Sequence, residues 1–196
     1  QEEIELAKLI GLLHDIGRFE QARIYDSFKD HENIDHGDLG VQILRESNYI
    51  RKYIEEDRYD DIILKSIKNH NKFKIEDGLT EDELLFSKIV RDADKWDIFY
   101  EGVEMFWGTE EERKMIEEST LTPEIANDFF SRTYVNREKV ITQADGILHF
   151  IALIFDINFE YTYNQIKETD YINKILDKFN FRDKETAKIM EEVRNI

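Results

Sequence analysis

Three of the five histidines lie on apolar faces of predicted helices. His14 follows Ile10 and His70 follows Ile67 at helical spacing, while His36 precedes a run of apolar residues at the same spacing. A buried imidazole needs a polar partner, and one metal ion can serve several imidazoles at once. One such histidine would fit an ordinary core position, but three in a short chain favour a metal site. His31 falls in a polar stretch and is predicted to be a surface residue.

An aspartate, Asp15, directly follows His14 within the string from Leu12 to Arg18, which reads LLHDIGR. Neighbouring residues on a helix point about 100° apart, so both side chains can reach one ion at the end of a helix. A His-Asp pair alone is common by chance. The longer string is more specific and indicates a site at the end of the first helix.

A second acidic segment, DADKWD, contains Asp92 and Asp94 inside an apolar helix. A carboxylate in such a helix is costly unless it is paired or binds a metal. Periodicity does not choose between the two aspartates. The one that is not a ligand is expected to cap the helix or to pair with Arg91 or Lys95.

The composition limits which kinds of protein and metal site are open. No cysteine is present, so any metal must be held by histidines and carboxylates. The net charge of -17 would repel a nucleic-acid polymer, which proteins bind through Lys and Arg, but it does not exclude a small phosphorylated substrate. No signal peptide and no apolar run long enough for a bilayer is visible, so a cytoplasmic protein without membrane contact is expected.

The elements that must position these residues are predicted to be helical, because proline and glycine are rare and Leu, Ile, Glu and Lys are abundant. The stretch from Phe19 to Asp35 is polar and is predicted to be a loop with at most one helical turn. Thr80 and Glu83 form a capping box, and Thr122-Pro123 marks another helix start. The other expected features are helices over residues 1–16, from 36 onward and over 60–71, a core segment over 137–159, and amphipathic helices over 170–196.

The strings LLHDIGR and DADKW together resemble the HD-domain phosphohydrolases, whose signature is a lone histidine, a His-Asp pair and a distant aspartate. The resemblance implies an all-α HD-domain helical bundle, with one domain over residues 1–196. The signature lies within about residues 1–100, and helices over 121–196 complete the fold. No histidine precedes His14, so we expect a further helix carrying the lone histidine upstream of this sequence.

The resemblance also implies a ligand set and a reaction. It selects Asp94 over Asp92 and places His36 and His70 in the site, so that the metal ligands are predicted to be His14, Asp15, His36, His70 and Asp94. The cofactor is predicted to be one or two divalent ions of Mn, Fe, Ni, Co, Mg or Zn. Such an ion activates water for attack on phosphorus. Asp15, His36 and His70 are the predicted catalytic residues, with the two histidines acting as a proton donor or as ligands of a second ion.

Arg18 and Lys95 are predicted to hold the phosphate oxygens of a small substrate, in particular a nucleotide. The alternative for each is an ordinary surface ion pair. Two other functions fit the same residues: a di-iron HD-type oxygenase, and a non-catalytic module that binds a nucleotide. The oligomeric state is left open, with a homo-oligomer as one option.

Overall fold

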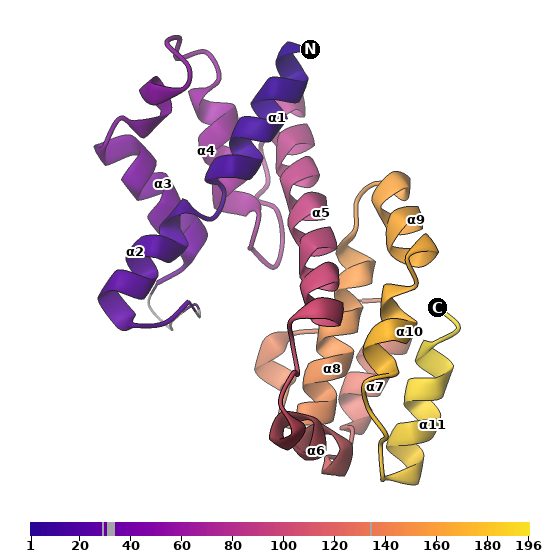
Figure 1. Cartoon of the computed structure of the whole chain (residues 1–196). Helices are drawn as coiled ribbons and strands as arrows, with labels where there is room; N and C mark the ends of the chain where they lie inside the picture. The colour runs from indigo at the N-terminus through magenta and orange to yellow at the C-terminus, as the bar shows by residue number, and fades with distance from the viewer. Residues whose placement is uncertain (29, 31–33, 134) are drawn as a thin grey trace. The chain divides into compact units, whose positions relative to one another are not determined.

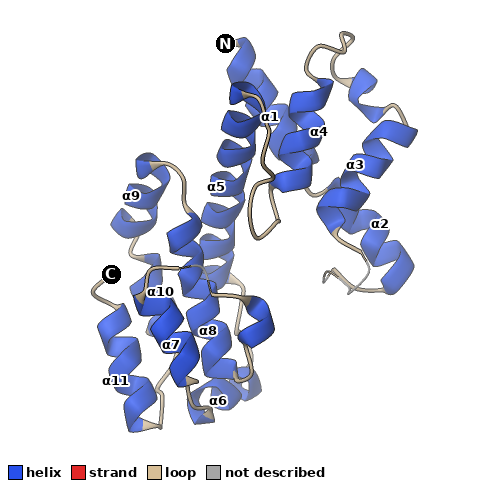
Figure 2. Cartoon of the chain, turned by 180° about the vertical axis from the view of Figure 1, so that it is seen from behind, coloured by secondary structure: helices blue, strands red, loops and turns tan. Residues whose placement is uncertain are grey.

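The computed structural model describes residues 1–28, 30, 34–133 and 135–196. His31 lies outside these residues, so its predicted exposure is not addressed. The described residues form helices and loops, none forms a β-strand (Figure 2), and the predicted all-α class is confirmed. Within this part of the chain, no helix has both the length and the apolar character needed to cross a membrane.

The chain groups into two compact units, Gln1–Asp94 and Lys95–Ile196. Helix α5 (Glu81–Glu104) contributes residues to both units. This grouping leaves the single domain over residues 1–196 as a prediction. Each unit has a hydrophobic core of its own and is described by itself below.

The first unit carries the residues singled out from the sequence. Helix α3 packs against α2 and α4, and α1 packs against α4 (Figure 1). Ile63 and Ile67 of α4 are completely buried in the core between these helices. Besides the first part of α5, the unit contains, in chain order, α1 (Glu2–Leu13), α2 (Ile16–Tyr25), α3 (His36–Glu46), the 3-10 helix η1 (Tyr49–Lys52) and α4 (Asp60–Asn69).

The second unit packs its helices around a core rich in aromatic and aliphatic side chains, and α8 contacts both α6 and α7. The predicted core segment over 137–159 supplies several completely buried residues, among them Leu148 and Ile151. The elements after α5 are α6 (Glu110–Glu118), α7 (Pro123–Phe130), η2 (Arg137–Lys139), α8 (Gln143–Ile151), η3 (Ala152–Asp156), α9 (Glu160–Glu168), α10 (Tyr171–Leu176) and α11 (Lys184–Val193).

Local signals in the sequence placed several helix starts correctly. Thr80 and Glu83 form the expected reciprocal hydrogen bonds ahead of α5, and α7 begins at Pro123. The loop predicted from Phe19 was wrong, because α2 continues to Tyr25. Only Gly17 and Gln21 of α2 are buried, so this helix carries no apolar stripe that could have revealed it.

Candidate metal centre

The break between α1 and α2 places His14 and Asp15 side by side. Helix α1 ends at Leu13, His14 follows it, and Asp15 precedes α2. Nδ1 of His14 lies 2.7 Å from the carbonyl oxygen of Gly11. A carbonyl only accepts, so Nδ1 carries the proton and Nε2 keeps its lone pair. That Nε2 lies 3.8 Å from Oδ2 of Asp15.

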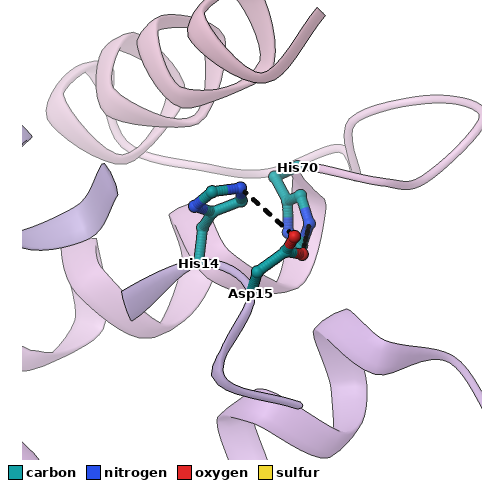
Figure 3. A group of neighbouring side chains, drawn as sticks. All are labelled: His14, Asp15 and His70. Carbon is teal, nitrogen blue, oxygen red and sulfur yellow. Dashed lines mark ion pairs between the residues drawn. The ribbon is translucent and has the colours of Figure 1, made fainter. Parts of the chain in front are cut away.

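The third member of the group is His70, which ends α4 and is only 1% exposed. Its Nδ1 donates to the carbonyl oxygen of Ile67 at 2.6 Å, so its Nε2 also carries the lone pair. The ligand atoms of His14, Asp15 and His70 all lie within 4.8 Å of one another. Figure 3 shows the two rings and the carboxylate pointing toward one another. Imidazole nitrogens and a carboxylate oxygen in this arrangement can hold one cation.

The carbonyl end of α4 is held by a buried arginine from α5. Nη1 of Arg91 donates to the carbonyls of Asn69, His70 and Lys72 at 2.7, 3.3 and 2.6 Å. The guanidinium satisfies carbonyls that the end of α4 leaves without partners, and its positive charge interacts favourably with the negative end of the helix dipole. Arg91 therefore fixes the backbone on which His70 is carried.

His36 is the first residue of α3, and its buried ring lies 4.8 Å from that of His70, measured between ring centroids. Its Nδ1 lies 2.7 Å from Oδ1 of Asp30. Its Nε2 lies 2.9 Å from Nε2 of His70 and 3.1 Å from Oδ1 of Asp15. Three helix ends thus bring three imidazole Nε2 atoms to one carboxylate.

Close packing of α2 on α3 makes this approach possible. A Cβ atom at Gly17 would lie 2.0 Å from the carbonyl oxygen of His36 and 2.7 Å from the backbone nitrogen of Gly40. Both are backbone atoms, which cannot turn aside as a flexible side chain can. Glycine is therefore required at position 17 to let α3 approach Asp15.

Asp94, the distant aspartate of the signature, also lies close to the His-Asp pair. Oδ1 of Asp94 on α5 lies 3.6 Å from Nε2 of His14, whereas Asp92 is a buried residue that is 2% exposed. The structure thus brings Asp94 to the His-Asp pair, as the sequence interpretation expected. Its role as a metal ligand stays a prediction.

The charges of this group fit a cation. His36 and His70 both donate from Nδ1 to oxygen atoms, so a hydrogen bond between their Nε2 atoms requires an additional proton and makes one ring positive. The geometry therefore calls for a positive charge at this point, which either a proton or a metal ion can supply. Three nitrogen and two carboxylate donors are the mixed set that first-row divalent metals accept. On these grounds the residues fit the implied metal.

The pKa values of His36 and Asp15 also indicate that a positive charge is favoured at this point. Burial alone would lower the pKa of His36, but hydrogen bonds with Asp15 and Asp30 outweigh it and raise this pKa to about 9. Burial alone would raise the pKa of Asp15, but the imidazoles of His36 and His70 hold it well below its ordinary value. Without a metal, His36 is therefore protonated and Asp15 ionised at neutral pH.

The two predicted phosphate-binding residues are engaged within the protein. Nε of Arg18 donates to Oδ2 of Asp15 at 3.0 Å, and its Nη1 donates to the carbonyl of Phe28 at 2.8 Å. Nζ of Lys95, in the second unit, lies 2.8 Å from Asp156 and the lysine is 5% exposed. For Lys95 the structure shows an ion pair that is largely buried rather than at the surface. Contact of either residue with a substrate stays a prediction.

Sequence reasoning missed the residues that support the histidines. Asp30 lies in a polar stretch six positions before His36, and nothing in its sequence context marks it. Arg91 was considered only as a partner for an aspartate, whereas its guanidinium reaches back to α4. A charged residue next to two aspartates in an apolar helix was a signal for burial, but it did not point to His70.

The all-helical fold and the cluster of histidines and aspartates, most of them at helix ends, define a class of helical domains with a candidate metal centre. Residues 1–98 match the family model described as HD domain. The match covers half of the chain, and the protein belongs to the HD-domain family. No curated protein and no solved structure matches the chain.

Proposed function

We propose that this protein is a metal-dependent phosphohydrolase that cleaves a phosphoester or phosphoanhydride bond in a nucleotide or a similar small phosphorylated molecule. The observation that carries the proposal is the convergence of His14, Asp15, His36, His70 and Asp94 on one place, with each histidine presenting Nε2. Membership of the HD-domain family supports the metal-dependent class of hydrolases.

The side chains divide the work in this proposal. His14, Asp15 and Asp94 would hold the cation, and His36 and His70 would either complete its ligand set or hold a second ion. A bound divalent cation supplies Lewis-acid chemistry, activating water and neutralising charge on phosphoryl oxygens.

Asp15 takes the central position, because its two oxygens face different histidines: Oδ1 lies 3.1 Å from Nε2 of His36 and Oδ2 lies 3.8 Å from Nε2 of His14. Arg18 donates to Oδ2 and keeps the carboxylate in this orientation. When Nε2 of His36 or His70 is not bound to metal, it can hold the proton that a leaving oxygen requires. The proposed substrate contact of Arg18 would use the part of its guanidinium that faces solvent.

The test is phosphate release by the full chain, loaded with Mn²⁺, from a panel of nucleoside mono-, di- and triphosphates and from bis-p-nitrophenyl phosphate. We expect hydrolysis that chelation abolishes and that the Asp15→Ala variant lacks. An Asp77→Ala variant, altered at an exposed turn carboxylate, serves as the matched control and should retain activity. Oxygen consumption by the iron-loaded protein without phosphate release would instead favour the oxygenase alternative.

A further inference from the structure

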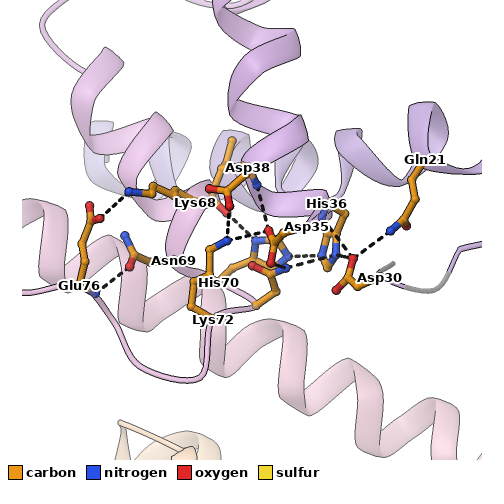
Figure 4. A network of polar contacts seen from close by, with 12 residues as sticks. Gln21, Asp30, Asp35, His36, Asp38, Lys68, Asn69, His70, Lys72 and Glu76 are labelled. Carbon is orange, nitrogen blue, oxygen red and sulfur yellow. Dashed lines mark hydrogen bonds and ion pairs between the residues drawn. The ribbon is translucent and has the colours of Figure 1, made fainter. Parts of the chain in front are cut away.

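The carboxylate of Asp30 lies behind the ring of His36, on the side away from the metal centre. Its Oδ1 lies 2.7 Å from Nδ1 of His36 and also accepts from the backbone N–H of the same residue at 3.2 Å. Nε2 of Gln21 donates to the same oxygen at 3.0 Å, and Gln21 itself is completely buried in α2. Figure 4 shows Gln21 and His36 both directed at Asp30.

These contacts fix Asp30 as well as His36. The backbone N–H of His36 is one of the donors that the start of α3 leaves without a partner inside the helix, so Asp30 ties the ring and the helix end together. Gln21 prevents the carboxylate from turning away. The side chain of Asp30 is 35% exposed, and it is not part of the hydrophobic core.

A competing donor lies close to the same ring nitrogen. Nδ2 of Asn71 is 3.3 Å from Nδ1 of His36, and it also donates to Oδ2 of Asp35 at 2.9 Å. The carboxylate of Asp35 accepts only, so it orients the Asn71 amide with its N–H groups toward His36. Asn71 therefore favours the tautomer with a bare Nδ1, whereas Asp30 favours the tautomer that carries the proton on Nδ1.

We propose that Asp30 is a positioning residue that holds His36 as the Nδ1–H tautomer and so presents the lone pair of Nε2 to the metal. Asp30 prevails over Asn71 because it is closer to Nδ1 and negatively charged. Its 2.7 Å distance to Nδ1 is also shorter than the 3.1 Å between Nε2 and Asp15, the acceptor on the other side of the ring. Without Asp30, the amide of Asn71 donates to Nδ1 and the proton moves to Nε2, where it blocks metal binding. The part of the proposal that concerns metal rests on the proposed function.

The experiment compares Asp30→Ala with the wild-type full chain and with Asp26→Asn, a change at an exposed carboxylate near the end of α2, where asparagine tolerates the left-handed backbone. One measurement is the affinity for Mn²⁺ alone by titration calorimetry. The other is the tautomer of His36, read from long-range ¹H–¹⁵N correlations of the metal-free protein at about pH 10, above the pKa of about 9 that His36 has in the wild type. Thermal unfolding is recorded for each variant.

We expect D30A to bind Mn²⁺ about 10- to 100-fold more weakly than the wild type, as for other outer partners of metal-bound histidines, and to show the Nε2–H tautomer. D26N should match the wild type in both measurements. A D30A variant that keeps the Nδ1–H tautomer overturns the proposal, whatever its affinity. So does one that binds Mn²⁺ as tightly as D26N.

If D30A does not fold, the same two measurements are made on the Asp30→Asn variant. Its amide oxygen still accepts from Nδ1 but without the negative charge, so we expect the Nδ1–H tautomer and an affinity loss below about tenfold. An affinity equal to that of D26N, or the Nε2–H tautomer, overturns the proposal. A wild-type protein that binds no Mn²⁺ contradicts the proposed function instead, and the tautomer measurement, which needs no metal, still tests Asp30.

Discussion

Replacing Gly17 by alanine tests whether the packing of α2 on α3 sets the geometry of the metal centre. The added Cβ would lie 2.0 Å from the carbonyl oxygen of His36, and ordinary contact begins at 3.4 Å. The backbones must therefore separate by about 1.4 Å. This separation would move His36, whose Nε2 lies 3.1 Å from Oδ1 of Asp15.

The cost follows from the rigidity of both partners. Overpacking of this kind destabilises proteins by about 1–3 kcal/mol, and metal sites tolerate distance errors of only about 0.2 Å. We expect Gly17→Ala to lower the free energy of unfolding by about that amount and to weaken Mn²⁺ binding at least about tenfold, because His36 moves away from Asp15. Urea unfolding and titration calorimetry measure the two effects.

Gly11→Ala is the matched control. Gly11 also lies in a helix next to the site, but a Cβ there meets nothing within 4 Å. Alanine should therefore stabilise α1 by up to about 1 kcal/mol and leave Mn²⁺ binding unchanged. If the Gly17 and Gly11 variants have the same stability and the same affinity for Mn²⁺, the packing of α2 on α3 does not set the geometry of the metal centre.

Three further predictions concern the charges. Asp15→Ala should weaken Mn²⁺ binding at least about tenfold, and a variant that retains the wild-type metal content would show that the site is assigned wrongly. Because the metal-free pKa of His36 is about 9, a metal ion must displace its proton at neutral pH. The apparent Mn²⁺ affinity should thus rise about tenfold per pH unit and level off above that pKa, whereas calorimetry showing no proton release would contradict this. Lys95→Met removes the ammonium group 2.8 Å from Asp156 and should cost about 1–3 kcal/mol in urea unfolding. Lys95→Met combined with Asp156→Leu should cost less, and an equal or greater loss in the double variant would contradict the ion-pair interpretation.

The sequence predicted the elements that carry an apolar stripe or a recognisable cap. Helices α3 and α4 follow their stripes, and Thr80 and Pro123 mark the starts of α5 and α7. Helix α2 was missed because its closest approach to α3 is at Gly17, which has no side chain to contribute to a pattern. A helix held by close backbone contact leaves no hydrophobic period to read.

The sequence named the five side chains that the structure brings close together, and their role as a site stays a prediction. His14 and Asp15 are adjacent in sequence, and the resemblance to the HD family added His36, His70 and Asp94. The supporting contacts were not predictable, because they join segments whose spacing depends on the fold. Arg91 reaches carbonyls 19 to 22 positions earlier, for example.

Anomalous scattering from crystals of the full chain, grown or soaked with Mn²⁺, shows directly whether these side chains hold a metal ion. We predict a manganese peak within coordinating distance of Nε2 of His14, with oxygen atoms of Asp15 and Asp94 among its ligands. If no manganese peak is present at saturating Mn²⁺, and Nε2 of His36 is still bonded to Nε2 of His70, these side chains do not converge to hold a metal ion.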